Sequence, residues 1–260
     1  MLKVIACQYD IAWEDRAANF DRVRELLGKN GGGDFSGGLI VLPEMFATGF
    51  SMNLEATTEP EGAPAINFMR ELASQHEAAV MGGFVTQSEN KDKFGRNELR
   101  VVAPSGDELA RYQKIRTFRY TQEFDFYERG REIVTFHWGG LKICPLICYD
   151  LRFPELFRRG VAHGGAEVFI VIASWPKVRA EHWVVLLRAR AIENQAWVVG
   201  VNRSGSDPNW DYPGRSVVIN PMGEIVADAG AEEGMLIAEL DPMVVREWRD
   251  EFPALMDLEI

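Results

Sequence analysis

The sequence is poor in cysteine, histidine and positive charge, and each shortage excludes a class of protein. Three cysteines among 260 residues are too few for a disulfide framework, so we expect a reduced, cytoplasmic protein. Lys and Arg total 28 against 39 for Asp and Glu, and this net charge of −11 argues against nucleic-acid and membrane-surface partners. The four histidines show no H-x-H or H-E-x-x-H spacing, so we expect no metal site.

Long apolar runs are also missing. The longest candidate, VFIVIASW at 168–175, has the length of a strand and falls far short of the ~18 residues that span a bilayer. No extended apolar segment follows the first residues, MLKVIACQYD. We therefore expect neither a membrane-spanning helix nor a secretory signal.

What is present is an ordinary globular composition, with 47% hydrophobic and 26% charged residues. Apolar periodicity of two and of 3.6 alternates along the chain and predicts strands interleaved with helices, plus several hairpins. The strand candidates are 3–8, 39–44, 79–85, 97–103, 108–114, 132–138, 141–148, 166–173, 196–202, 215–220, 223–228 and 234–240, and the helix candidates are 14–29, 62–77, 154–163 and 178–194. No linker divides the chain, so we expect one mixed α/β domain over residues 1–260.

Three of the apolar strands each end in one reactive group. LIVLPE ends at Glu44, ELARYQK at Lys114 and KICPLIC at Cys148. Ligands gather at strand ends in α/β folds, because side chains leave the core there while the backbone stays fixed. A thiol becomes a nucleophile when it loses its proton, a carboxylate can accept and return that proton, and an ammonium group stabilises an oxyanion. The three groups together predict a thiol-dependent active site.

Three sequence blocks resemble the signatures of a known family. LPEMFATGF (42–50), YQKIRTF (112–118) and ICYDLRFPELFR (147–158) are similar to the signature blocks of the nitrilase, or carbon–nitrogen hydrolase, superfamily. The similarity continues through ASWP (173–176), RARAIENQAWVVGVNRSG (188–205) and INPMGEIVADAG (219–230). The resemblance implies a single-domain, four-layer α-β-β-α sandwich that needs no cofactor and acts on a small-molecule amide.

The resemblance also assigns catalytic roles. The Glu-Lys-Cys triad of the family maps onto Glu44, Lys114 and Cys148, with the backbone N–H of Tyr149 as a further oxyanion donor. Many members carry a second glutamate between the lysine and the cysteine, and in QEFDFYERG that residue is Glu123 or Glu128. Glu123 matches better, since it stands five residues before the Glu-Arg-Gly that closes the segment.

The block around the nucleophile, CYDLRFPE, looks like that of the omega-amidase branch, which hydrolyses the terminal amide of 2-oxoglutaramate and 2-oxosuccinamate. Such substrates carry a carboxylate, which needs a cation or several N–H donors. Arg116, Arg119 and Arg179 are the candidates for it, and Phe118 and Trp175 are candidate apolar walls.

Other interpretations stay open. The substrate is alternatively an N-carbamoyl amino acid, an aliphatic amide or a deaminated peptide, and a non-catalytic binding member is a further alternative. A serine hydrolase is disfavoured because no G-x-S-x-G elbow occurs. Relatives pair through helices like 154–163 and 178–194, so we expect a homodimer or a higher homo-oligomer.

For four further residues we expect structural rather than catalytic roles. Cys7 and Cys144 lack a matching sequence context and are expected in the core. Asp150 and Arg152 are expected to form an ion pair around the turn of the nucleophile.

Overall fold

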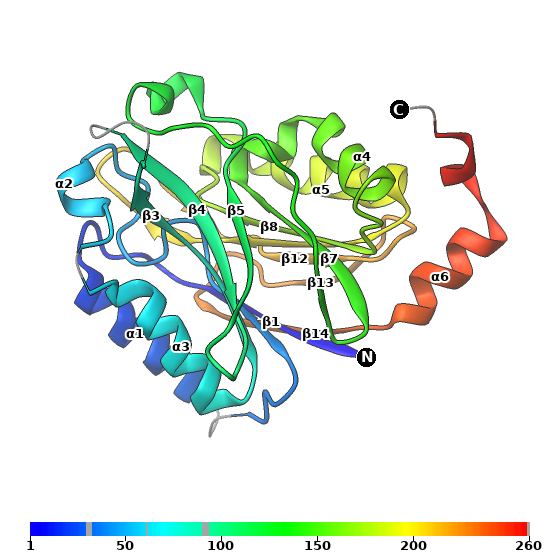
Figure 1. Cartoon of the computed structure of the whole chain (residues 1–260), viewed down its shortest axis with the longest axis horizontal. Helices are drawn as coiled ribbons and strands as arrows, with labels where there is room; N and C mark the ends of the chain where they lie inside the picture. Colours follow the sequence, from blue (N-terminus) through cyan, green and yellow to red (C-terminus); the bar gives the residue numbers. More distant parts are fainter. Residues whose placement is uncertain (30–32, 61, 90–93, 259–260) are drawn as a thin grey trace.

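Two six-stranded sheets lie face to face at the centre of the molecule (Figure 1). The computed structural model describes residues 1–29, 33–60, 62–89 and 94–258. The first sheet has the order β14-β1-β2-β3-β4-β5 and consists of β1 (Leu2–Gln8), β2 (Leu39–Val41), β3 (Ala79–Gln87), β4 (Gly95–Val102), β5 (Glu108–Gln113) and β14 (Gly234–Leu240). The second has the order β13-β12-β9-β8-β7-β6 and consists of β6 (Phe136–Trp138), β7 (Leu141–Ile147), β8 (Val168–Ala173), β9 (Trp197–Asn202), β12 (Val217–Ile219) and β13 (Ile225–Asp228).

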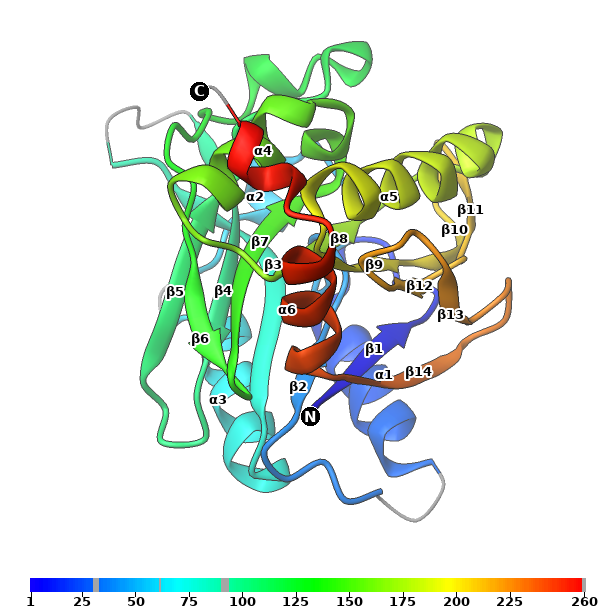
Figure 2. The ribbon, with the colours of Figure 1, turned by 90° about the vertical axis from the view of Figure 1, so that its right-hand side faces the viewer.

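Each sheet is parallel at its centre and antiparallel at both edges. Strands β1, β2 and β3 run parallel in the first sheet, and β7, β8 and β9 in the second. Parallel neighbours need a crossover. Helices α1 (Arg16–Gly28) and α3 (Pro64–His76) provide it for the first sheet, and α4 (Pro154–Ala162) and α5 (Ala180–Asn194) for the second. Figures 1 and 2 show these two helix pairs on the outer faces of the sandwich.

The alternation of side chains along the strands produces two separate apolar layers. On β1, Val4 and Ala6 belong to the core between the sheets, whereas Ile5 and Cys7 belong to the core under α1 and α3. The core between the sheets extends on to the helices of the second sheet and includes Cys144. Both cysteines expected in the core are fully buried there.

The predicted mixed α/β class and four-layer sandwich are confirmed, and most element boundaries agree within two residues. The strand predicted over 132–138 is wrong for most of its length, since only Phe136–Trp138 pair with a neighbour. Helix α6 (Pro242–Glu251) and the hairpin of β10 (Ser204–Ser206) and β11 (Asp211–Pro213) were not predicted. Asp241 caps α6 and Pro242 occupies its first turn, a helix-start signal that the sequence does carry.

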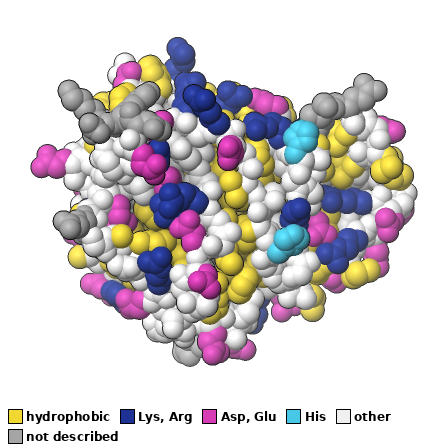
Figure 3. Space-filling model, viewed as in Figure 1, with side chains coloured by type: hydrophobic (Ala, Val, Ile, Leu, Met, Phe, Trp, Pro, Cys, Tyr) yellow, Lys and Arg dark blue, Asp and Glu magenta, His cyan; other side chains and the backbone are white. Residues whose placement is uncertain are grey.

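Shorter elements complete the fold. They are helix α2 (Leu54–Thr57) and the 3-10 turns η1 (Arg119–Thr121), η2 (Glu123–Asp125), η3 (Cys148–Arg152), η4 (Lys177–Arg179) and η5 (Ala254–Asp257). Within the described ranges, no helix combines the length and the apolar character needed to cross a membrane. Lys, Arg, Asp and Glu side chains are interspersed on the face shown in Figure 3, so the excess of acid does not form a single acidic surface there.

Candidate active site

The three predicted catalytic residues follow three different strands and meet at one end of the sandwich. Glu44 lies in the turn after β2, Lys114 directly follows β5, and Cys148 begins η3 after β7. The first two come from one sheet and the third from the other. The turn at Glu44 passes close to Gly83 of β3, where a Cβ would lie 3.1 Å from the Glu44 Cα, so this position accepts only glycine without a shift.

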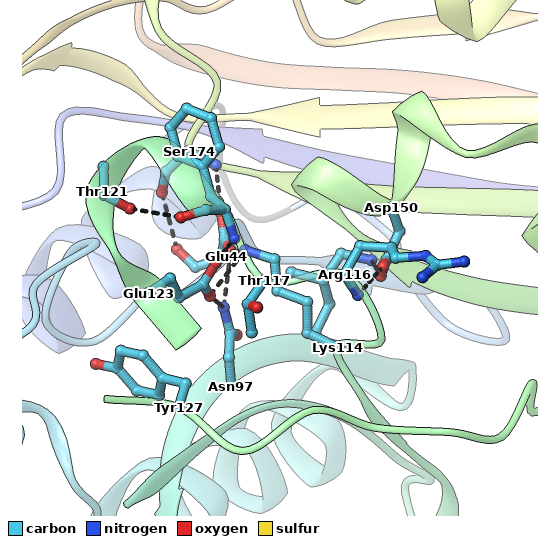
Figure 4. Close-up of polar contacts among 12 residues, drawn as sticks. Glu44, Asn97, Lys114, Arg116, Thr117, Thr121, Glu123, Tyr127, Asp150 and Ser174 are labelled. Atoms are coloured by element: carbon cyan, nitrogen blue, oxygen red, sulfur yellow. Dashed lines mark hydrogen bonds and ion pairs between the residues drawn. The ribbon is translucent and has the colours of Figure 1, made fainter. Parts of the chain in front are cut away.

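Lys114 lies between two buried carboxylates (Figure 4). Its Nζ is 2.8 Å from Oε1 of Glu44 and 3.0 Å from Oε1 of Glu123. All three side chains are at most 1% exposed. The structure therefore places Glu123, rather than Glu128, beside the predicted triad.

Asn97 and Ser174 complete the hydrogen bonding of these carboxylates. Asn97 Nδ2 donates to Oε1 of Glu44 at 2.8 Å and to Oε1 of Glu123 at 3.2 Å. The backbone N–H of Ser174, directly after β8, donates to Oε2 of Glu44 at 2.9 Å. Glu123 also accepts the backbone N–H of Phe118. Both carboxylates are thus held by several donors and cannot turn freely.

Charge and burial oppose each other in this cluster. Burial alone would lower the pKa of Lys114, but the Glu123 and Glu44 carboxylates outweigh it and raise that pKa above its ordinary value. Burial raises the pKa of Glu123, and Lys114 counters part of that effect. Lys114 therefore stays cationic at neutral pH.

Cys148 has a strained backbone and a protonated thiol. Its φ of +45° lies in the left-handed region that residues with a side chain rarely adopt. Burial and the charge of Glu44 raise the thiol pKa well above its ordinary value, while Lys114 and the N–H of Ser174 act in the opposite direction. A thiol held in this way needs a base to remove its proton during reaction, and Glu44 is the adjacent candidate.

A pocket opens in front of Cys148. Its lining residues are Phe50, Lys114, Phe118, Cys148, Tyr149, Arg152, Ser174, Trp175, Pro176, Arg179, Trp210 and Tyr212. Of the predicted substrate-binding residues, Phe118, Trp175 and Arg179 are among them. Thiol and ammonium lie at the inner end with the carboxylates behind them, and arginines and aromatic rings line the rest.

Arg116 and Arg119 do not line this pocket. Arg116 pairs with Glu155 at 2.8 Å, and its guanidinium lies over the ring of Phe153. Arg119 is exposed on η1 and lies over Phe124. Their predicted contact with a substrate carboxylate is not supported, because both side chains point to partners elsewhere.

The expected ion pair between Asp150 and Arg152 is wrong. Asp150 is fully buried and accepts hydrogen bonds from the hydroxyl of Tyr112 and from two backbone N–H groups. Arg152 instead points into the pocket, with its guanidinium 4.7 Å from the ring centre of Trp175 and 3.3 Å from Nδ1 of His182.

The donor set of this site suits acyl transfer. A thiol on a strained turn and a carboxylate in contact with an ammonium group are the parts that form and break a thioester. No group of three or more His, Cys, Asp and Glu side chains suited to a metal ion occurs within the part of the chain that the structure describes.

Comparison with known proteins agrees with this chemistry. A family model described as carbon-nitrogen hydrolase matches residues 3–250. The chain is 40% identical to omega-amidase YafV of Escherichia coli (strain K12), over 99% of this chain and 97% of the relative. It is 33% identical to 2-oxoglutaramate amidase of Bacillus subtilis (strain 168), over 98% and 96%. The structure of XC1258 from Xanthomonas campestris, a CN-hydrolase superfamily protein with an arsenic adduct in its active site, matches with a TM-score of 0.91 and 32% identity, over 100% of this chain and 97% of that one.

The chain belongs to the carbon–nitrogen hydrolase family. As a member, it is an enzyme that hydrolyses amides.

Seven pocket or network residues of this carbon–nitrogen hydrolase were missed in the sequence: Phe50, Asn97, Arg152, Ser174, Pro176, Trp210 and Tyr212. Asn97 and Arg152 had no distinguishing local pattern. Trp210 and Tyr212 belong to the unpredicted β10–β11 hairpin. Its sequence, SGSDPNWDYP, is rich in Ser, Gly, Asp and Pro, which is typical of a loop.

Proposed function

We propose that this enzyme cleaves the terminal amide of small 2-oxo acid amides, such as 2-oxoglutaramate and 2-oxosuccinamate, to the dicarboxylate and ammonia. The amidohydrolase class follows from the family; the substrate class is the proposal. It draws on the likeness to the two relatives and on the charge of the pocket.

The carrying observation is a pair of arginines without acidic partners. Arg152 and Arg179 both line the pocket that contains Cys148. Across the described ranges, neither forms an ion pair, and Nη2 of Arg179 is buried with no hydrogen-bond partner. Burial and the Arg179 guanidinium lower the pKa of Arg152, with Tyr149 opposing them. A substrate carboxylate placed between the two cations relieves this repulsion and satisfies the free donor.

Aromatic rings hold Arg179 in place. Its guanidinium lies 5.5 Å from the ring centres of both Phe118 and Trp210 and 5.8 Å from that of Tyr120. Trp175 Nε1 donates to the carbonyl of Arg179 at 2.8 Å. The cation is thus fixed at low entropic cost before substrate arrives, which favours recognition of a small anion.

In the first half-reaction, Glu44 takes the proton of Cys148 and the thiolate attacks the amide carbon. Lys114 and the backbone N–H of Tyr149 stabilise the oxyanion, and one such donor contributes roughly 3–4 kcal/mol in enzymes where it has been removed. The tetrahedral intermediate collapses when Glu44 returns the proton to the departing nitrogen. Ammonia leaves and a thioester remains on Cys148.

In the second half-reaction, Glu44 removes a proton from water, which attacks the thioester carbon. The same two donors stabilise the second oxyanion, and the proton returns to the thiol as the acid leaves. Glu123 orients Lys114 through the 3.0 Å contact. Every step uses groups of this chain and water.

The test is ammonia release from a panel of 2-oxoglutaramate, 2-oxosuccinamate, glutamine, asparagine, an N-carbamoyl amino acid, a simple aliphatic amide, a deaminated peptide and a nitrile. We expect the highest kcat/KM for the two 2-oxo acid amides. A clear preference for another substrate overturns the proposed substrate class. Cys148→Ala is expected to abolish turnover, and near-normal turnover by Cys148→Ser contradicts the thioester mechanism.

We also propose that the enzyme is a homodimer or higher homo-oligomer that pairs through α4 and α5. In support, Val185 and Ile192 of α5 are 60% and 53% exposed, and Val226 of neighbouring β13 is 50% exposed. Sedimentation velocity checks this, with Val185→Asp expected to yield monomers. A wild-type monomer at micromolar concentration contradicts it.

A cytoplasmic location is part of the same proposal. Its support is that all three cysteines are free, since a nucleophilic thiol persists best in a reducing compartment. Cell fractionation tests it, and recovery of the protein outside the cytoplasm contradicts it.

A further inference from the structure

A buried carboxylate that the mechanism does not use lies between the two strands that supply Lys114 and Cys148. Asp150 is fully buried in η3, two residues after Cys148 (Figure 4). Its Oδ2 accepts the Tyr112 hydroxyl at 2.7 Å and the N–H of Ile147 at 3.1 Å. Its Oδ1 accepts the N–H of Arg116 at 2.8 Å.

Two of the three donors flank Lys114 in the sequence, and the third directly precedes Cys148. Tyr112 stands two residues before Lys114, and Arg116 stands two residues after it. Ile147 directly precedes Cys148, so its N–H lies at the entry to the strained turn. Lys114 follows β5 of the first sheet and Cys148 follows β7 of the second. One side chain therefore connects the catalytic ends of the two sheets.

The chemistry of the contacts requires a carboxylate. All three partners donate, so both oxygens of Asp150 must accept. An asparagine of the same shape has only one acceptor oxygen, and its NH₂ group would face a backbone N–H. The Asp150→Asn substitution therefore keeps volume and burial while it breaks this connection.

The chain holds a similar arrangement elsewhere, at an aspartate whose carboxylate additionally lies 3.8 Å from Nη1 of the buried Arg203. Asp207, in the loop between β10 and β11, also accepts one tyrosine hydroxyl, that of Tyr212 at 2.5 Å, and two backbone N–H groups, those of Asn209 at 2.7 Å and Trp210 at 2.9 Å. Its side chain is 1% exposed. Asp207 thus fixes two residues of the outer pocket wall and touches neither Lys114 nor Cys148 in any contact of the described residues.

We propose that Asp150 is a positioning residue that sets the distance and orientation of Lys114 relative to Cys148 by holding the two strand ends together. The proposal rests on the catalytic roles proposed above for those two residues. Because a displacement of about 1 Å between reacting groups can cost about 10²-fold in rate, loss of the connection is expressed in the chemical step.

The experiment compares Asp150→Asn with Asp207→Asn in two assays at pH 8, above the Asp150 pKa, which burial raises to about 7. With 2-oxoglutaramate, we expect Asp150→Asn to lower kcat about 10²-fold and to change KM less than about threefold. Asp207→Asn is expected to raise KM and to leave kcat within about threefold, because it affects the wall of the pocket. Equal kcat and KM changes in the two variants overturn the proposal.

The second assay does not depend on substrate identity. Iodoacetamide labels the three cysteines, and mass spectrometry of peptides separates Cys148 from the buried Cys7 and Cys144. Lys114 lowers the Cys148 pKa, so its displacement in Asp150→Asn should slow Cys148 labelling about tenfold, one pKa unit. Faster labelling of all three cysteines indicates mere loosening of the fold and overturns the proposal.

Tyr112→Phe keeps the test decisive if Asp150→Asn fails to fold. It removes a single donor, and we expect an approximately threefold to tenfold loss of kcat at unchanged KM, with Cys148 labelling slowed in parallel. Unchanged kcat and unchanged labelling in Tyr112→Phe contradict the proposal. If the wild type does not hydrolyse 2-oxoglutaramate, the proposed substrate fails, whereas the labelling comparison still decides the role of Asp150.

Discussion

The two ends of the pocket differ in whether their positively charged side chains have carboxylate partners. At the inner end, Lys114 is 1% exposed and is paired with two carboxylates, those of Glu44 and Glu123. At the outer end, Arg152 and Arg179 are partly exposed and have no carboxylate partner among the described residues.

Under the proposed function, the inner end of the pocket carries out the chemistry and the outer end binds the substrate carboxylate. A buried cation without a partner is costly, so a group that must remain charged throughout a catalytic cycle is compensated by the protein itself. A cation whose partner arrives with the substrate remains uncompensated in the free enzyme. Missing charge balance in a pocket therefore indicates where an anionic ligand binds.

Removing the cation at the inner end should have the largest effect on activity and stability. In Lys114→Met, the two carboxylates lose their cation and the oxyanion loses a donor. We expect kcat to fall at least about 10³-fold and the free energy of unfolding to fall by about 3–5 kcal/mol. Ammonia release and urea denaturation measure the two quantities.

Arg24 provides a matched control on the surface, since it also bridges two carboxylates, those of Asp21 at 3.1 Å and Glu71 at 3.2 Å. Because this cluster is exposed, Arg24→Met should cost no more than about 1 kcal/mol of stability and leave activity intact. Equal losses in the two variants would show that burial does not distinguish the clusters.

The inner end also determines how Cys148 responds to pH. Burial and Glu44 raise its pKa well above the ordinary value, so the thiolate fraction in the free enzyme should rise about tenfold per pH unit, or about 10²-fold from pH 7 to pH 9. The rate of Cys148 carboxamidomethylation, followed by mass spectrometry, measures this. An unstructured cysteine peptide with blocked termini is the control, and its rate should level off above its pKa of about 8.5. A plateau for Cys148 below pH 8 is incompatible with the described electrostatics.

The inner end was largely predictable from the sequence, and the outer end was not. Glu44, Lys114 and Cys148 each lie just beyond an apolar strand, β2, β5 and β7, so local pattern alone singled them out. Their meeting depends on the pairing of strands within each sheet and on the packing of the two sheets. Glu123 required the family resemblance, because it begins the short 3-10 turn η2 and does not follow an apolar strand.

The outer end depends on packing between segments that are distant in the chain. Arg179 was one of three arginines predicted for the substrate carboxylate, and nothing local distinguished it from Arg116 or Arg119. Only the fold places Arg179 against Trp210 and directs Arg116 to Glu155. Such contacts set the direction of a side chain after a turn. They join segments that are distant in the chain, so a local sequence pattern does not predict them.

Removing the outer cation should affect binding rather than chemistry. We expect Arg179→Met to raise KM for 2-oxoglutaramate about 10- to 50-fold, the cost of one charge-assisted contact, with kcat changed less than about threefold. Stability should fall by no more than about 1 kcal/mol, because Arg179 forms no ion pair among the described residues and the variant loses only its contacts with the aromatic rings. Steady-state kinetics and thermal denaturation provide the measurements.

Arg119→Met is the control for a nearby exposed arginine outside the pocket, and its KM should stay within about twofold of the wild-type value. A neutral aliphatic amide serves as the second control, because Arg179→Met should not weaken its binding. If both substrates lose equally, Arg179 shapes the pocket without recognising a carboxylate.

The smallest of the expected effects is that of salt concentration, which should change KM through the outer arginines and leave kcat unchanged. The outer arginines are partly exposed, and the screening length falls from about 10 Å at 0.1 M salt to about 3 Å at 1 M. Raising sodium chloride from 0.05 to 0.5 M should therefore increase KM for 2-oxoglutaramate by about two- to threefold. The inner cluster is at most 1% exposed and is not reached by ions, so kcat should stay constant. A neutral amide carries no charge for salt to screen, so the wild-type KM for it should stay constant. A salt-dependent kcat at constant KM would reverse the assignment of the two ends.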